Sequence, residues 1–127
     1  MTENEIAKII VDTAFRIHTR LGPGLLESAY QAVMVYELRK RGLYVEEENI
    51  MPIHYDGIIL DTGYRADIIV EKKVIIELKS VEKIADVHKK QLLTYLRLAD
   101  MHLGLLINFG APLIKDGISR IVNGLIE

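Results

Sequence analysis

Cysteine is absent from this chain of 127 residues, and so are long apolar runs and any large excess of positive charge. Without cysteine there is no disulfide framework, no thiolate zinc site and no cysteine nucleophile, which agrees with an intracellular protein. Apolar runs span only a few residues, and the N-terminal segment contains Glu3, Glu5 and Lys8. We therefore expect neither a signal peptide nor a membrane span, and a cytoplasmic location.

The formal net charge is −2 at pH 7. Because nucleic-acid affinity depends largely on neutralising phosphates, this value excludes a strongly basic DNA-binding module. Local basic clusters remain at residues 39–41, 72–73 and 88–90. Such clusters usually form solvated faces. A protein that acts on nucleic acid would require at least one of these basic clusters beside its active site.

The length and composition suit one globular domain over residues 1–127, with half of the residues apolar and about a quarter charged. Apolar residues at helical intervals predict helices over residues 2–20, 25–41 and 86–99. Thr2 and Glu5 have capping-box spacing at the first helix, and Gly42 is the expected stop of the second.

Strand patterns occupy the middle and the end of the chain. Residues 43–60 predict strands joined by a hairpin turn at Asp56-Gly57, with an edge or a bulge at Pro52, and residues 61–63 predict a further turn. The apolar run at 103–109 suits a buried strand, and residues 111–127 leave hairpin, helix and strand open. We expect an α/β domain with a mixed central sheet of about four main strands flanked by helices.

The most informative stretch is residues 64–80, YRADIIVEKKVIIELKS. Two apolar β-type runs flank residues 71–73, which predicts a hairpin with a three-residue loop. Asp67 then lies directly opposite Glu77, and alternation along the strand adds Lys79 to their face. The same alternation turns four apolar residues to the other face: Ala66, Ile68, Ile76 and Leu78.

Two carboxylates facing each other across a strand pair are destabilising unless something compensates their charge. A divalent cation is the obvious compensator, and hard oxygen ligands suit Mg²⁺ or Mn²⁺. The alternative is an acidic, solvated strand edge without a ligand.

Asp67 followed by Glu77-Leu78-Lys79 resembles the D…ExK core of the PD-(D/E)XK nuclease superfamily. The resemblance implies a restriction-endonuclease-like fold and metal-dependent hydrolysis of phosphodiester bonds, with DNA as the expected substrate. It further implies that Asp67 and Glu77 are metal ligands, that the Leu78 carbonyl is another, and that Lys79 stands beside the attacking water.

The segment HTRLGPGLLESAY, residues 18–30, resembles the signature of the GxxExxY proteins of the same superfamily, with Gly24, Glu27 and Tyr30 at the defining positions. Related nucleases direct a glutamate of the first core helix toward the metal, which implies this role for Glu27. Without the resemblance, Glu27 is a carboxylate favoured by the dipole at a helix start.

Gln91 and Tyr95 are four residues apart and so share one helix face. Their spacing resembles the Gln-x-x-x-Tyr motif of RecB-type nucleases, which implies that both help to position the active residues or the phosphate. A helical tyrosine beside Leu92 and Leu96 otherwise indicates a core residue.

Other chemistries find little support. Gly22-Pro23-Gly24 lacks the Lys-Ser/Thr of a P-loop, the four histidines lack ligand spacing, and no serine has a nucleophile-elbow context. Two alternatives stay open: a nucleic-acid-binding or accessory subunit that does not cleave, and an interaction protein that self-associates through its N-terminal helix and keeps a vestigial site. A homodimer also stays open, because dimerisation could supply a basic groove.

Overall fold

The computed structural model describes residues 1–126, with the exception of the side chains of residues 62 and 63. The elements follow in the order α1 (Glu3–Leu21), α2 (Glu27–Lys40), β1 (Val45–Tyr55), β2 (Ile58–Val70), β3 (Val74–Lys79), α3 (Asp86–Ala99), β4 (Leu103–Asn108), the 3₁₀-helix η1 (Ile114–Gly117) and β5 (Ile118–Val122). This α/β arrangement confirms the predicted fold class. Within residues 1–126, no helix combines the length and the apolarity needed to cross a membrane.

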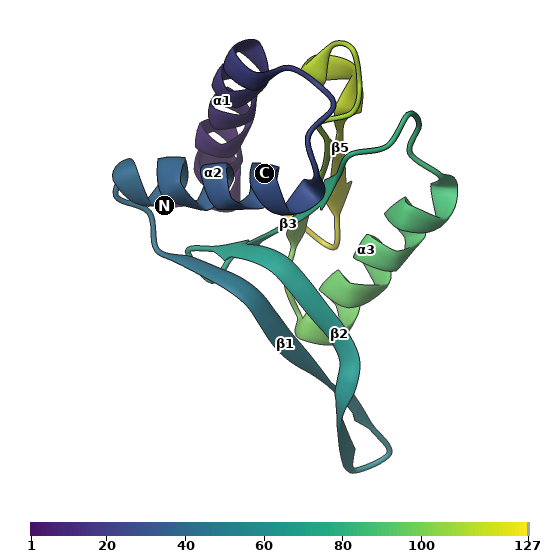
Figure 1. Cartoon of the computed structure of the whole chain (residues 1–127). Coiled ribbons are helices and arrows are strands. Elements are labelled where there is room, and N and C mark those ends of the chain that lie inside the picture. The colour runs from purple at the N-terminus through teal and green to yellow at the C-terminus, as the bar shows by residue number, and fades with distance from the viewer. Residues whose placement is uncertain (127) are drawn as a thin grey trace.

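Over residues 1–126 the sheet has five strands in the order β1-β2-β3-β4-β5, one more than expected. Among these strands only the β3–β4 pair is parallel, and α3 forms the crossover between them. α1 and α2 cover one face of the sheet and α3 covers the other (Figure 1). Each face buries its own apolar cluster, so the domain has three layers.

The predicted helix signals are confirmed at α1 and α3. Thr2 and Glu5 form a capping box at the start of α1, and α3 spans residues 86–99 as predicted. α3 also packs closely on the sheet, because Gly104 of β4 lacks a side chain: an added Cβ would lie 2.9 Å from Leu92 Cγ. Packing of the buried leucines of α3 therefore depends on this glycine.

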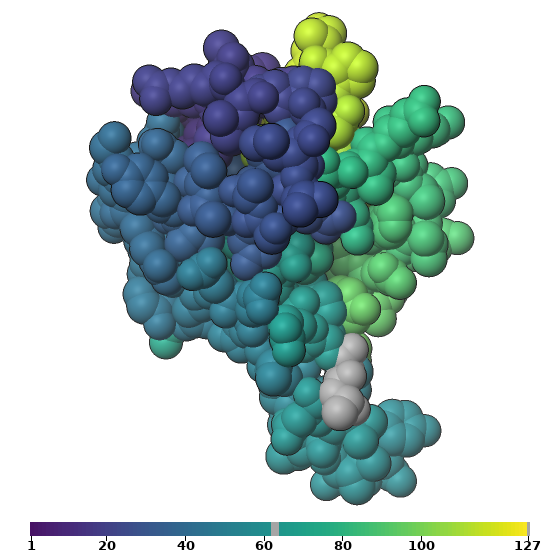
Figure 2. Space-filling view, in the orientation of Figure 1, coloured from purple at the N-terminus to yellow at the C-terminus, as the bar shows by residue number. Residues whose placement is uncertain are grey.

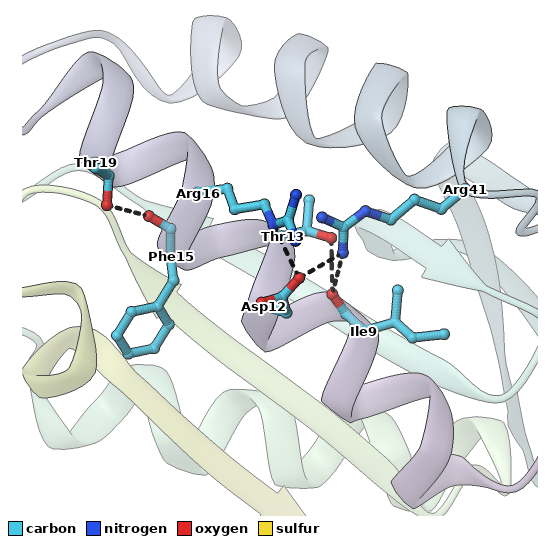
Figure 3. Close-up of polar contacts among 7 residues, drawn as sticks. All are labelled: Ile9, Asp12, Thr13, Phe15, Arg16, Thr19 and Arg41. Carbon is cyan, nitrogen blue, oxygen red and sulfur yellow. Dashed lines mark hydrogen bonds and ion pairs between the residues drawn. The ribbon is translucent and has the colours of Figure 1, made fainter.

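Polar contacts join the two helices of the first layer (Figure 3). Arg41, which follows α2, donates to Asp12 Oδ2 over 2.9 Å, and Arg16 reaches the same oxygen over 3.1 Å. The buried Thr13 hydroxyl donates to the Ile9 carbonyl of its own helix. Because exposed ion pairs contribute little, the packing of α1 on α2 rests mainly on their apolar faces.

The β1–β2 hairpin projects beyond the body of the molecule, and its outer part, residues 50–60, is called the arm below (Figures 1 and 2). The turn at Asp56 and Gly57 has positive φ angles of 49° and 79°, as the Asp-Gly signal predicts. The ladder shifts register between Met51 and Ile53, which confirms a bulge at Pro52 on an edge strand. The turn predicted at residues 61–63 is wrong, because β2 runs through them without a break.

Candidate metal centre on the central hairpin

The β2–β3 hairpin has the predicted register. Val70 pairs with Val74 across a loop in which Glu71 and Lys72 adopt left-handed conformations, with φ angles of 54° and 56°. The last residues paired in the ladder are Ile68 and Ile76. The next step along both strands brings Asp67 to Glu77, and there side-chain hydrogen bonds replace the backbone ladder.

The distribution of side chains over the two faces agrees with the prediction at three positions and differs at one. Ile68, Ile76 and Leu78 pack in the cluster under α1 and α2. Ala66, predicted on that same face, packs instead in the cluster under α3. Strict alternation fails here next to an irregularity of the ladder: the opposite residue of β1, Glu48, has a positive φ of 45°, and its pairing with Asp67 is skipped.

The carboxylates of Asp67 and Glu77 are each held by backbone donors of the hairpin. The Leu78 N–H donates to Asp67 Oδ2 over 2.9 Å, and the Asp67 N–H approaches Glu77 Oε1 at 3.4 Å. Both side chains are half-buried. Two acids are thus fixed against each other at the point where the strands part.

Burial and charge both act on this pair. Loss of water around Glu77, followed by the nearby negative charge of Asp67, raises the pKa of Glu77 from its ordinary value of 4.5 to about 7. A carboxyl pair with one raised pKa holds a proton near neutral pH unless a cation replaces it. The electrostatics therefore favour positive charge at this place.

Leu78 and Lys79 follow Glu77 on β3. In a strand, the N–H and C=O of one residue point to the same neighbour, and the Leu78 N–H reaches Asp67, so the Leu78 carbonyl also lies on the β2 side. Lys79 is half-buried, and its own carbonyl accepts the Phe109 N–H over 2.9 Å, which anchors the end of β3.

The loop between α1 and α2 lies beside the end of β3. The hydroxyl of the buried Tyr30 donates to the Gly22 carbonyl and accepts the Leu25 N–H. Ser80 Oγ donates to the Leu25 carbonyl over 2.6 Å, which ties the loop to the residue after Lys79. Tyr30, one of the three defining positions of the GxxExxY pattern, thus has a structural role: it fixes the loop segment from which α2 begins.

Glu27 is the first residue of α2 and is exposed. Among residues 1–126, excepting the two undescribed side chains, no three His, Cys, Asp or Glu side chains gather where they could hold one metal ion. The structure therefore brings together Asp67 and Glu77 and does not add Glu27 to them. A role of Glu27 as a ligand stays a prediction.

α3 contributes an aromatic contact to the site. Tyr95 stacks on Tyr64 with ring centroids 3.3 Å apart and planes inclined by 10°, and the Tyr64 hydroxyl donates to Glu77 Oε1. Gln91, one turn earlier, is exposed. Tyr95 thus lies next to the carboxylate pair, one residue removed, while the role of Gln91 stays a prediction.

Tyr64 is the site residue that sequence reasoning missed. It stands three residues before Asp67, and strict alternation would turn the two side chains to opposite faces. The irregularity opposite Asp67 removes this separation, and no sequence pattern signals it. The aromatic residue on the strand that carries Asp67 was the only available indication.

The donor set fits a hard divalent cation. Two carboxylates and one backbone carbonyl from adjacent strands are the kind of oxygen ligands that Mg²⁺ uses, with water and substrate phosphate completing its shell. The pKa of Glu77 is raised to about 7, first by burial and then by the charge of Asp67, and a cation beside the pair would oppose both effects. The residues present are therefore suited to the ion that the D…ExK pattern implies.

Comparison with known proteins agrees with this geometry. The model of the PD-(D/E)XK nuclease superfamily matches residues 4–121, which covers both helical layers and all but the last residue of the sheet. The chain belongs to the PD-(D/E)XK nuclease superfamily. Searches of the curated proteins and of the solved structures found no match.

Proposed function

We propose that this protein is a nuclease that hydrolyses DNA phosphodiester bonds with Mg²⁺ or Mn²⁺. The observation that carries the proposal is the Asp67–Glu77 pair, half-buried at the point where β2 and β3 stop pairing, with Lys79 two residues after Glu77. Family membership supports a nuclease in general terms. The metal, the substrate and the roles of individual residues belong to the proposal.

In this proposal, Asp67, Glu77 and the Leu78 carbonyl would hold the ion, and Glu27 would be a further ligand only if the start of α2 moved toward them. The bound ion supplies a Lewis acid that stabilises charge developing on the phosphate. Lys79 orients the attacking water and assists its deprotonation, and its charge offsets that of the phosphate. Gln91 and Tyr95 position the carboxylates or the phosphate from α3.

The distribution of charge indicates which surface faces DNA. Residues 42–64, which include the whole arm, contain no Lys or Arg and five Asp or Glu, so the arm is unsuited to phosphate contact. α3 begins at Asp86, shortly after β3 ends at Lys79, and exposes Lys89 and Lys90 in its first turns. We infer that DNA enters across this end of the sheet.

Cleavage of linear and branched DNA in the presence of Mn²⁺ tests the proposal. The wild type should cut, whereas Asp67→Asn and Lys79→Ala should lose at least about 100-fold in rate, the range expected for loss of a proton-transfer or charge-stabilising group. Glu82→Gln is the matched control, because Glu82 is an exposed acid just after β3.

The three outcomes of this experiment separate the functions. Cleavage that depends on Asp67 and Lys79 supports the nuclease. Cleavage that survives both changes contradicts it. Binding of DNA and metal by the wild type without cleavage assigns the accessory, non-cleaving role, which the modest net charge also allows.

A further inference from the structure

Tyr64 holds one oxygen of Glu77 from the neighbouring strand. Its hydroxyl donates to Glu77 Oε1, the oxygen that the Asp67 N–H also approaches at 3.4 Å. Both donors belong to β2, whereas Glu77 belongs to β3. The hairpin therefore fixes the Glu77 carboxylate from the side through Oε1.

The four oxygens of the pair fall into two groups. Glu77 Oε1 and Asp67 Oδ2 accept hydrogen bonds from the Tyr64 hydroxyl and the Leu78 N–H, respectively. Among the described residues, Glu77 Oε2 and Asp67 Oδ1 receive no backbone or tyrosine donor. They are the oxygens left for a cation.

We propose that Tyr64 is a positioning residue, whose hydroxyl holds Glu77 Oε1 so that Oε2 faces the metal, and that stacking on Tyr95 holds Tyr64 in place. This inference rests on the proposed metal-dependent function and extends it to a residue outside the D…ExK pattern. Partners that orient metal-binding carboxylates are typical of metal sites.

The choice of tyrosine at this position supports the inference. A phenylalanine ring could stack on Tyr95 equally well, and a half-buried hydroxyl requires a partner that the ring alone does not need. Within the part of the chain that the structure describes, this hydroxyl has one hydrogen bond, to Glu77. The hydroxyl thus binds the Glu77 carboxylate, and the ring packs on Tyr95 of α3.

A calorimetric titration of Mn²⁺ alone into the full chain tests whether Tyr64 positions Glu77 for the metal. Tyr64→Phe should weaken Mn²⁺ binding by about 10- to 100-fold, the usual effect of removing a partner of a metal ligand. Tyr95→Ala, which removes the stacked ring, should weaken Mn²⁺ binding in the same direction as Tyr64→Phe.

Tyr44→Phe is the matched control. The Tyr44 hydroxyl donates to Glu46 Oε1 over 2.9 Å, so this variant removes an equivalent tyrosine–glutamate bond at an exposed place on β1. Its Mn²⁺ affinity should equal that of the wild type. Denaturant unfolding of each variant shows whether the protein remains folded under the conditions of the titration.

Cleavage kinetics give a second test, because a purely structural role of Tyr64 would not change kcat and KM separately. If Tyr64 acts only through the Glu77 carboxylate, Tyr64→Phe should lower kcat at a fixed Mn²⁺ concentration and leave the KM for DNA unchanged. A rise in KM alone would contradict the positioning role.

The failures of the two proposals are distinguishable. If the wild type binds Mn²⁺ and folded Tyr64→Phe binds it equally well, the inference about Tyr64 is wrong and the nuclease proposal stands. If Tyr95→Ala retains full affinity, the part assigned to stacking is wrong. If the wild type binds no Mn²⁺, both proposals are wrong.

Discussion

The carboxylate of Asp67 accepts a hydrogen bond from the Leu78 N–H, over 2.9 Å, where the β2–β3 ladder has already ended at Ile68 and Ile76. Asp67 therefore serves the hairpin as well as the site, because it satisfies a backbone donor that has no ladder partner. Any substitution of Asp67 changes both functions unless the new side chain keeps an acceptor.

Asp67→Asn and Asp67→Ala should consequently differ in stability. Asparagine retains an oxygen acceptor for the Leu78 N–H, whereas alanine leaves this donor unpaired in a half-buried place, at a cost of about 1–3 kcal/mol in the free energy of unfolding. Denaturant unfolding at low pH, where Glu77 is protonated and repulsion is absent, measures the difference. Equal stabilities would show that the hydrogen bond contributes nothing.

The raised pKa of Glu77 predicts a pH dependence of folding in the metal-free protein. Between its unfolded value of 4.5 and its folded value of about 7, the folded state binds a proton that the unfolded state has released. The stability from this group is therefore complete below pH 4.5 and is lost as the pH rises through about 7, by up to about 3 kcal/mol.

Glu77→Gln tests this dependence, since glutamine keeps an acceptor for the Tyr64 hydroxyl and does not ionise. Compared with the wild type, the variant should lose less free energy of unfolding between about pH 5 and pH 8. Glu82→Gln should follow the wild type. A variant that loses as much stability as the wild type would show that Glu77 titrates normally.

The hydrogen bonds of the Tyr30 hydroxyl should stabilise the loop before α2. The hydroxyl bonds the Gly22 carbonyl and the Leu25 N–H, so Tyr30→Phe should lower the free energy of unfolding by about 1–3 kcal/mol. It should also speed hydrogen exchange at the Leu25 amide. Tyr36→Phe is the control, because Tyr36 is an exposed tyrosine of the same helix. Unchanged exchange at Leu25 would mean that the loop is held by other contacts.

The assignment of the DNA-facing surface predicts a change in salt dependence. If Lys89 and Lys90 contact phosphates, replacing both by alanine should reduce the slope of log affinity against log salt by about 2, over roughly 50–200 mM salt. Lys72 and Lys73 lie in the loop at the opposite end of β3 and supply the control pair. Equal slopes for both double variants would place the DNA elsewhere.

Much of the fold follows from local sequence signals. α3 begins and ends where its period indicates, the hairpin register follows from the length of the loop at residues 71–73, and Pro52 marks the register shift between β1 and β2. These features depend on residues close together in the chain. The arrangement of Asp67 opposite Glu77 follows from the same register.

The remaining features depend on contacts between distant segments. The turn signal at residues 61–63 is overridden because β2 pairs with β1 on both sides of it, at Leu60 and at Tyr64. Ala66 and Tyr64 lie on the α3 side, against strict alternation, next to an irregularity at Glu48 on the neighbouring strand. The contact of Tyr64 with Tyr95 joins a strand to a helix two elements later, which no local period can show.

Calorimetric titration of Mg²⁺ and Mn²⁺ into the wild type and Asp67→Asn tests the central claim most directly. The wild type should bind a divalent ion at the Asp67–Glu77 pair, Asp67→Asn should lose this binding while remaining folded, and Glu82→Gln should keep it. Failure of the wild type to bind either ion, even with DNA present, would contradict the claim that this pair is a metal centre.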